Sequence, residues 1–199
     1  METEELIKLH QMNFGPDYLP DPNRHLSIPR DLKHYQYTIS TLRGKRYKTI
    51  LDIGCFDGWL DFLLTRMKYW VTGIELIEEL ANAANRYADR NFIPYKAHHC
   101  RFMETEIKSI FDVVLCYETL EHVSFEDVPG FIDKMESLCN EMILISLPDQ
   151  KHEDNIQHQW TPTEEVIKEL FGHKKNFDLQ YFSYGPGPVP PNWFISYEV

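Results

Sequence analysis

The sequence predicts an α/β fold with a doubly wound, mostly parallel seven-stranded sheet that finishes in a C-terminal antiparallel hairpin. Short apolar runs alternate with segments of helical periodicity, at the spacing that gives parallel strands. Gly54 and Gly58 follow the first apolar run, where a strand would turn into a helix. The last two strand-like runs, residues 177–184 and 193–199, have no helix between them. They should therefore pair antiparallel.

The N-terminal part of the chain carries no clear strand. Residues 4–12 and 32–42 are predicted helices, and residues 16–29 are a predicted loop with four prolines. We expect residues 1–45 to be a helical segment that either lids the site or packs against one edge of the sheet. Residues 46–199 should form the main domain.

The main domain is predicted to alternate strands with helices along the chain. The expected strands before the hairpin are residues 50–53, 70–75, 92–97, 111–116 and 142–147. The expected helices are residues 59–67, 77–90, 128–138 and 162–171. In the last of these, Thr161 should be the N-cap and Pro162 the first helical residue.

Length, composition and charge limit the classes of protein that fit. A chain of 199 residues and 23.7 kDa can bury one substantial core, so we expect a single domain. The formal net charge of −11 and a pI near 5.2 argue against a broad phosphate-binding face. Residues 43–48 hold the only dense basic patch of the sequence. A solvated loop before the first strand explains that patch more simply.

The lack of a long apolar run and the pattern of the cysteines predict a cytoplasmic protein. No stretch approaches the roughly 20 apolar residues of a membrane span, and the acidic N-terminus lacks a signal-peptide pattern. The four cysteines, Cys55, Cys100, Cys116 and Cys139, form no C-x-x-C pair. A reducing environment, without a disulfide framework, is therefore expected.

The turn after the first strand predicts a nucleoside-containing cofactor. An apolar strand that stops at a glycine turn brings a ligand close to backbone N–H groups at a helix start. The second strand ends in Glu75, seventeen residues after Gly58. An acid at that strand end is the usual partner of a ribose diol.

Four motifs resemble those of the class I S-adenosylmethionine-dependent methyltransferases. They are residues 51–58 (LDIGCFDG), 73–75 (GIE), 111–114 (FDVV) and 118–123 (ETLEHV). The resemblance covers residues 48–147 in order, with a looser continuation to the C-terminus. It implies S-adenosylmethionine as the cofactor, and the terminal hairpin also matches that family.

The resemblance implies which residues bind this cofactor. Asp52, Gly54 and Gly58 would hold its methionine part, and Glu75 would take both ribose hydroxyls. The full set of expected cofactor-binding residues is Asp52, Gly54, Cys55, Phe56, Gly58, Glu75, His99 and Tyr117. Two alternatives stay open, since Asp52 could only satisfy backbone donors in the turn and Glu75 could be a solvated strand end.

Phe56 departs from the family pattern, which usually has a glycine at this position. A side chain there limits how closely the backbone can approach a ligand. Cofactor binding could survive with the loop shifted, since Asp57 and Gly58 remain. Weaker binding and a cofactor-binding subunit without catalysis are the alternatives that stay open.

A carboxylate–histidine cluster is predicted just beyond the fourth strand. If Glu118 begins a helical turn, Glu118, Glu121 and His122 share one face. They could bind a divalent metal such as Mg²⁺ or Mn²⁺, or supply a general base with its orienting partner. His158 is the preferred fourth metal ligand, with His152 behind it.

The resemblance extends to two groups of methyltransferases that share the Glu-x-x-Glu-His sequence. These are the ubiquinone-pathway O-methyltransferases and the small-RNA 3′-end 2′-O-methyltransferases. O-methylation of a small molecule or metabolite is the leading hypothesis, with His122 as base and Glu118 or Glu121 orienting it. The acidic chain disfavours a metal-dependent methylation of an RNA 3′-terminal ribose. A dinucleotide-dependent oxidoreductase is disfavoured because the loop lacks Gly-x-Gly-x-x-Gly.

Overall fold

The computed structural model describes residues 18–149, 157–184 and 189–199. The chain divides into two compact units, one ending at Ile107 and one starting at Lys108. The helix predicted over residues 4–12 lies outside the described residues. In the part that the structure describes, no helix is both long enough and apolar enough to cross a membrane. All four cysteines are free thiols, and the predicted cytoplasmic location stays a prediction.

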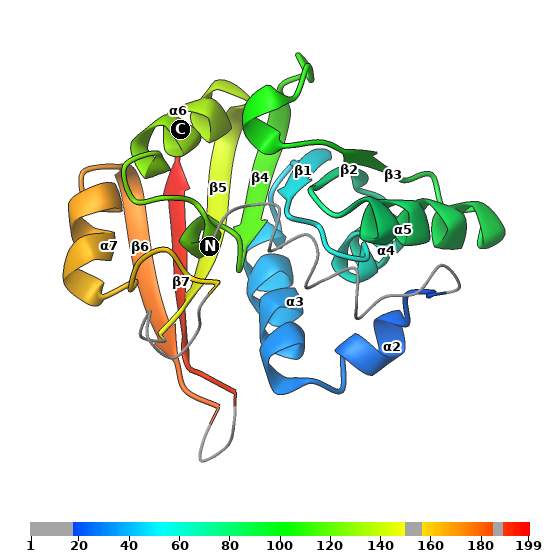
Figure 1. Cartoon of the computed structure of the whole chain (residues 1–199), viewed down its shortest axis with the longest axis horizontal. Helices are drawn as coiled ribbons and strands as arrows, with labels where there is room; N and C mark the ends of the chain where they lie inside the picture. Colours follow the sequence, from blue (N-terminus) through cyan, green and yellow to red (C-terminus); the bar gives the residue numbers. More distant parts are fainter. Residues whose placement is uncertain (1–17, 150–156, 185–188) are drawn as a thin grey trace. The chain divides into compact units, whose positions relative to one another are not determined.

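The first unit is built on three parallel strands with two connecting helices (Figure 1). The strands, in sheet order, are β3 (Lys96–His99), β2 (Trp70–Glu75) and β1 (Thr49–Ile53). Helix α4 (Trp59–Arg66) packs on β2, and helix α5 (Glu78–Arg90) packs on β2 and β3. The chain thus turns from β1 into α4 at the glycines.

Among the described residues from 18 onward, two helices precede β1, and prolines begin both of them. Helix α2 (Pro22–His25) lies inside the predicted loop of residues 16–29, so that part of the prediction is wrong. The side chain of Asp21 caps α2 by accepting hydrogen bonds from two backbone N–H groups. Helix α3 (Pro29–Leu42) begins three residues earlier than predicted, because a proline is well suited to the first helical position. Helix α2 packs against α4.

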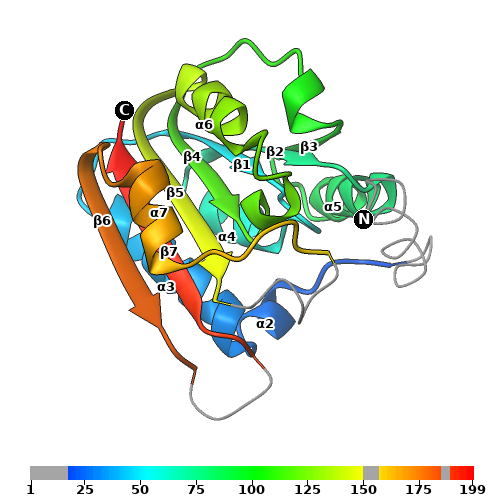
Figure 2. The ribbon, with the colours of Figure 1, turned by 60° about the vertical axis from the view of Figure 1, so that its left-hand side comes forward.

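The second unit carries the remaining four strands and two helices. The strands, in sheet order, are β4 (Phe111–Tyr117), β5 (Cys139–Pro148), β7 (Asn192–Glu198) and β6 (Lys175–Phe182). Strands β4 and β5 are parallel, whereas β7 is antiparallel to both β5 and β6. Figure 2 shows α6 (Val128–Ser137) and α7 (Glu164–Phe171) over one face of this sheet.

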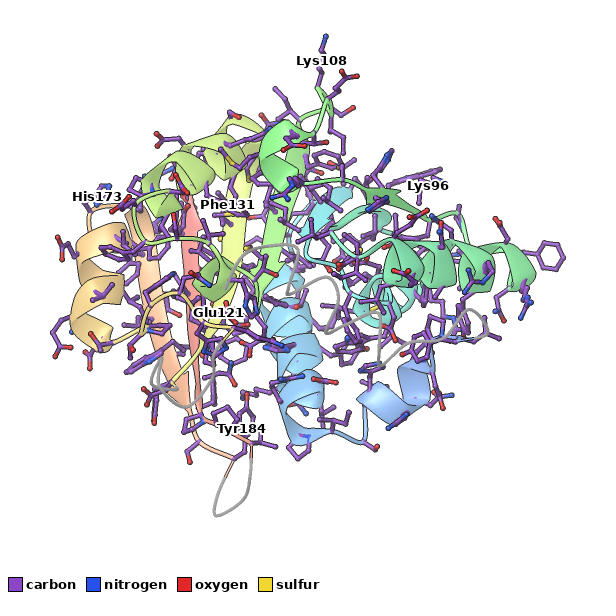
Figure 3. All side chains as sticks on the ribbon, in the orientation of Figure 1. Lys96, Lys108, Glu121, Phe131, His173 and Tyr184 are labelled. Carbon is purple, nitrogen blue, oxygen red and sulfur yellow. The ribbon has the colours of Figure 1, made fainter. Side chains whose placement is uncertain are left out.

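Buried apolar side chains explain why these strands form. In β4 and β5, Val113, Leu115, Ile143 and Ile145 have no exposed surface. Strands buried on both faces read as continuous apolar runs, which is the pattern seen in the sequence. Each such side chain stabilises the fold by about 1.5–3 kcal/mol. Phe131 of α6, labelled in Figure 3, is 5% exposed and belongs to the same core.

The predicted fold class is confirmed, with seven mostly parallel strands and a C-terminal antiparallel hairpin. Several predicted boundaries are wrong, two of them for clear local reasons. The third strand begins at Lys96 rather than residue 92, because Phe92 has a positive φ of 54° and is 94% exposed in a turn. The last helix begins at Glu164, since Thr163 rather than Thr161 is its N-cap and accepts a hydrogen bond from the N–H of Val166.

Candidate functional site

The turn between β1 and α4 is held by backbone hydrogen bonds. The N–H groups of Gly54 and Cys55 donate to the carbonyl of Ile74, at 2.8 and 3.1 Å. The N–H of Gly58 donates to the carbonyl of Cys55 at 2.9 Å. Gly54 and Gly58 have φ values of 76° and 77°, which favour glycine. The predicted strand–turn–helix is therefore present. We call residues 54–58 the cofactor loop, after the prediction that they bind a cofactor.

Phe56 follows the same backbone path as the glycines around it. Its φ of 54° lies in the left-handed region, where a residue with a side chain costs about 1–2 kcal/mol. Its N–H donates to Oε2 of Glu75 at 2.8 Å. The departure from glycine thus leaves the left-handed turn in place.

Glu75 is buried at the end of β2, with only 6% of its surface exposed. The alternative of a solvated strand end is therefore wrong. Its Oε2 accepts the N–H of Phe56 and its Oε1 accepts the N–H of Ile77, both at 2.8 Å. Burial raises the pKa of Glu75 to about 7, although these backbone hydrogen bonds lower it. Each carboxylate oxygen has a second lone pair, so both can still accept a hydroxyl.

Asp52 on β1 forms a buried carboxyl pair with Asp61, which sequence reasoning missed. They are 5% and 0% exposed. Burial raises the pKa of Asp52 to about 7, although a hydrogen bond with Asp61 lowers it, and the pKa of Asp61 lies well above its usual range. Repulsion between the two buried carboxyls disfavours the state in which both are ionised. The only signal for Asp61 was an acid in the first turn of a helix.

Gly73 leaves the space that the cofactor loop needs beside β2. A Cβ at this position would lie 2.2 Å from the hydroxyl of Tyr95 and 2.5 Å from Sγ of Cys55. The Tyr95 hydroxyl donates to that sulfur at 3.2 Å. Burial raises the pKa of the Cys55 thiol, so this residue is a packed neutral group.

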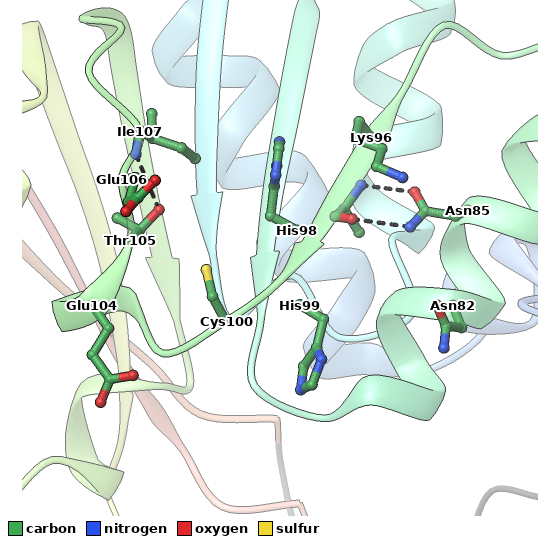
Figure 4. A pocket seen from close by; sticks show the side chains of 11 residues that line it. Asn82, Asn85, Lys96, His98, His99, Cys100, Glu104, Thr105, Glu106 and Ile107 are labelled. Carbon is green, nitrogen blue, oxygen red and sulfur yellow. Dashed lines mark hydrogen bonds between the residues drawn. The ribbon is translucent and has the colours of Figure 1, made fainter.

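His99 ends β3 and lines an open depression of about 570 Å³ in the first unit (Figure 4). The side chain of Asn85 closes the strand edge beside it, donating to the carbonyl of Ala97 and accepting its N–H, both at 2.9 Å. The exposed imidazole of His99 is accessible to a ligand. Tyr117, the other outlying cofactor prediction, ends β4 in the second unit with its ring edge-on to Phe194.

Glu118 is not part of the helical turn that the sequence predicted. A 3₁₀ turn, η2 (Leu120–His122), begins only after it, and Glu118 itself has a φ of 49°. Its Oε1 accepts hydrogen bonds from the hydroxyl of Ser146, at 2.9 Å, and from the amide of Asn192. The prediction that Glu118 shares a face with Glu121 and His122 therefore fails, and its carboxylate links three strands of the second unit instead.

Glu121, His122 and His158 do come together, as predicted. One potential ligand atom from each lies within 4.8 Å of the others. Glu121, labelled in Figure 3, is 1% exposed, and its Oε1 is 3.9 Å from Nε2 of His122. The two imidazole rings meet edge to face, 5.4 Å apart. His152, the reserve ligand, lies outside the described residues.

A backbone carbonyl sets the tautomer of His122. Its Nδ1 lies 3.1 Å from the carbonyl oxygen of Gln157, which can only accept a hydrogen bond. Nδ1 therefore carries the hydrogen, and Nε2 of the neutral ring keeps its lone pair. With a quarter of its side chain exposed, His122 can reach a substrate or an ion.

The segment after residue 156 is fixed to η2 by two further hydrogen bonds that the sequence did not reveal. The N–H of Gln159 donates to the carbonyl of Glu121 at 2.8 Å, and Nε1 of Trp160 donates to the carbonyl of Leu120 at 3.2 Å. The ring of Phe125 packs on Trp160 with centroids 5.6 Å apart. These contacts position His158 beside the turn.

Comparison with known proteins identifies the domain that carries these features. Residues 50–141 match a family model described as a methyltransferase domain. Residues 50–141 of this chain thus carry a methyltransferase domain. The ubiquinone biosynthesis O-methyltransferase of Coxiella burnetii (strain RSA 493 / Nine Mile phase I) is 35% identical over 101 residues, which are 50% of this chain and 41% of that protein. That of Rickettsia bellii (strain OSU 85-389) is 32% identical over 119 residues, 60% of this chain and 46% of that protein. The chain spans less than half the length of these curated relatives.

Solved structures show that the methyltransferase fold extends over most of the chain. Magnesium protoporphyrin IX methyltransferase from Synechocystis PCC 6803, with bound SAH, gives a TM-score of 0.69 at 14% identity over 98% of this chain and 94% of that one. The N-methyltransferase NodS from Bradyrhizobium japonicum WM9 gives 0.71 at 14% identity, over 87% and 98%. The family resemblance predicted from the sequence motifs is confirmed by the domain match and this fold.

Proposed function

We propose that this chain is an S-adenosylmethionine-dependent methyltransferase that methylates a hydroxyl oxygen of a small molecule. The observation that carries the proposal is the state of His122 in a methyltransferase domain. Its Nδ1–H donates to a carbonyl, so Nε2 is the proton-accepting nitrogen of the neutral ring. A base is needed when the methyl acceptor is a hydroxyl, since the hydroxyl must lose its proton. The ubiquinone O-methyltransferases at 31–35% identity support an oxygen acceptor.

Under this proposal the first unit holds the cofactor. Glu75 would accept both ribose hydroxyls with the oxygen lone pairs left over from its two backbone contacts. Asp52 and the left-handed glycines would surround the methionine part, where a carboxylate favours the positive charge of the amine. His99 and the open depression beside β3 would receive the adenine ring of the cofactor.

The second unit supplies the base. S-adenosylmethionine, when bound, would supply the methyl group that replaces the proton of the acceptor hydroxyl. Nε2 of His122 takes the hydroxyl proton. The buried carboxylate of Glu121, 3.9 Å away, stabilises the resulting imidazolium. The hydrogen bond to Gln157 keeps the ring oriented throughout.

A methyl-transfer screen tests this function. The full chain is incubated with methyl-labelled S-adenosylmethionine and a panel of phenols, catechols, aliphatic alcohols, amines and thiols. Label transferred to hydroxyl compounds is expected, and transfer only to amines or thiols would contradict the proposed acceptor. His173→Ala is the matched control, because this exposed histidine lies just after α7 and outside the cluster. It should leave the transfer rate unchanged.

A second candidate function follows from the metal-ligand geometry of Glu121, His122 and His158. Two imidazoles and one carboxylate within 4.8 Å fit a transition metal, and an imidazole oriented by a carbonyl through its other nitrogen is usual for a metal ligand. This donor set favours Mn²⁺ or Zn²⁺ over the predicted Mg²⁺. The metal, when bound, would polarise an acceptor hydroxyl such as that of an RNA 3′-terminal ribose diol. Glu118 is absent from this set.

Metal dependence separates the two candidates. Metal analysis of the purified chain is combined with activity after chelation and after Mn²⁺ is restored. An RNA with a free 3′-terminal diol is compared with the same RNA after periodate oxidation. Small-molecule transfer that survives chelation supports His122 as the base. Transfer to the diol that is lost with the metal supports the second candidate and makes His122 a ligand.

A further inference from the structure

His25, at the end of α2, packs on the cofactor loop from outside it. Its ring stacks on Trp59, the first residue of α4, with centroids 5.0 Å apart and planes 8° apart. Its edge also meets the ring of Phe56, at 6.2 Å and 80°. The residue that replaces the family's glycine is therefore in an aromatic contact with the N-terminal segment.

Hydrogen bonds reinforce this aromatic contact. Nδ1 of His25 lies 2.7 Å from Oδ2 of Asp31, and Nε2 lies 3.2 Å from Oδ2 of Asp57. The Tyr18 hydroxyl donates to the same Asp57 oxygen at 2.6 Å. Oδ1 of Asp57 accepts the N–H of Trp59 at 3.2 Å, so Asp57 also fixes the start of α4. Asp57 belongs to the cofactor loop and has no exposed surface.

The geometry requires His25 to be charged. Both ring nitrogens face carboxylate oxygens, and both can donate only in the imidazolium form. Burial alone would lower the pKa of His25, but its hydrogen bonds to Asp31 and Asp57 raise it to about 9. Arg30 also binds Asp31, at 3.1 Å. Burial and Asp57 raise the pKa of Tyr18, so its hydroxyl stays protonated over the working range.

We propose that His25 is a positioning residue for cofactor binding: with Tyr18, it holds Phe56 and Asp57 in the loop conformation that receives S-adenosylmethionine. This inference rests on the proposed cofactor. Phe56 must stay in a left-handed conformation that is unfavourable for residues with a side chain. A loop with this residue therefore needs stabilising contacts from outside the loop. The apparent affinity of a ligand falls with the fraction of molecules that have the binding-competent loop. The N-terminal segment thus takes over what a glycine does in other members of the family.

A double-mutant cycle tests the coupling between His25 and Phe56. The dissociation constant of S-adenosylmethionine is measured by calorimetry at pH 7 for the unchanged chain, His25→Ala, Phe56→Gly and the double variant. We expect His25→Ala to weaken binding about 10-fold in the Phe56 background and less than about 2-fold in the Phe56→Gly background. An equal loss in both backgrounds, or no loss in either, would overturn the inference. His173→Ala serves as the control histidine.

Charge is tested separately from packing. His25→Gln keeps hydrogen-bonding atoms but cannot become charged, and the melting temperature of each variant shows whether it folds. Affinity of the unchanged chain should fall as pH rises through about 9, where the imidazolium is lost, while that of His25→Gln should not change over this range. A fall of the same size in His25→Gln would overturn the role of the charge.

A readout without cofactor distinguishes this inference from the proposed function. A charged imidazole stacked on an indole quenches its fluorescence, so the emission of Trp59 should rise as His25 loses its proton. The difference between the unchanged chain and His25→Gln isolates this tryptophan, and its midpoint should lie near pH 9. A chain that shows this transition but binds no S-adenosylmethionine would contradict the proposed function. A chain that binds S-adenosylmethionine without the transition would contradict the charged contact.

Discussion

The cofactor loop of the first unit and the segment just before η2 in the second unit each contain one non-glycine residue in a left-handed conformation. Phe56 has a φ of 54° and Glu118 a φ of 49°. In the first unit this leaves the loop intact, because the N–H of Phe56 binds Glu75 and its ring packs on His25. In the second unit it separates Glu118 from the cluster and directs its carboxylate to Ser146 and Asn192. Motif spacing therefore predicts a shared face only where the backbone is regular.

The largest expected effect comes from the η2 cluster. His122→Ala should lower the methyl-transfer rate by about 100- to 10,000-fold, because it removes the proton acceptor. The dissociation constant of S-adenosylmethionine should stay within a factor of two, since His122 is not among the proposed cofactor contacts. Single-turnover rates and calorimetry measure the two quantities. Equal turnover in the variant would remove His122 from the mechanism, and a large loss of cofactor affinity would contradict the division of roles.

The next largest effect should come from Glu75, at the cofactor loop. Glu75→Ala removes the acceptor of two backbone N–H groups, so the free energy of unfolding should fall by about 2 kcal/mol or more. Binding of S-adenosylmethionine should weaken by about 100-fold, the cost of two charge-assisted hydrogen bonds. Urea denaturation and calorimetry measure these losses. Asp89→Ala, an exposed acid near the end of α5, should change neither. Tight binding by folded Glu75→Ala would refute the ribose assignment.

Much of the first unit could be predicted because its signals are local. A glycine turn after an apolar run, and an acid at the end of the next run, depend on residues a few positions apart in the sequence. The carboxyl pair of Asp52 and Asp61 and the contact of His25 with Asp57 depend on tertiary packing, so the sequence pattern did not reveal them. The short helix α2 was hidden because its prolines are as typical of loops as of helix starts.

For the second unit, the sequence predicted which residues meet in the cluster, except Glu118, but not the backbone conformation that positions them. Glu121, His122 and His158 meet as expected, although 35 residues lie between His122 and His158 in the sequence. The backbone conformation of Glu118 has no local sequence signal, because a glutamate rarely adopts a positive φ. Thr161 and Thr163 are equally good caps in the sequence, and only the structure distinguishes them.

Variants of Glu118 and Glu121 test whether only Glu121 belongs to the metal-ligand cluster of the second unit. Glu118→Ala leaves the buried Asn192 amide without this partner, and should lower the free energy of unfolding by about 1–3 kcal/mol. It should leave Mn²⁺ or Zn²⁺ binding unchanged. Glu121→Gln should weaken that binding and spare the contacts of Glu118. Thermal melts and metal titrations of both variants provide the test, and loss of metal binding in Glu118→Ala would restore it to the cluster.

The smallest expected effect is a pH dependence of cofactor affinity. Burial raises the pKa of Asp52 and of Glu75 to about 7, above their unfolded values, so these groups are more protonated in the folded chain and destabilise it as pH rises from about 4 to 7. A cationic cofactor favours their ionised forms, and its affinity should rise about 10-fold from pH 6 to pH 8. The loss of the His25 charge should then lower affinity above pH 9. Calorimetry from pH 6 to 10 should give a maximum near pH 8; affinity that falls steadily over this range would contradict the role of the carboxylates.

The central claim is that the loop at residues 54–58 and Glu75 bind S-adenosylmethionine. Calorimetric titration of the full chain at pH 8 tests it most directly, with NAD as the competing nucleoside cofactor and Glu75→Ala as the control. We expect saturable binding of S-adenosylmethionine with a micromolar dissociation constant, no heat with NAD, and little heat with the variant. A folded chain that gives no heat with S-adenosylmethionine, or that binds NAD instead, would contradict the account.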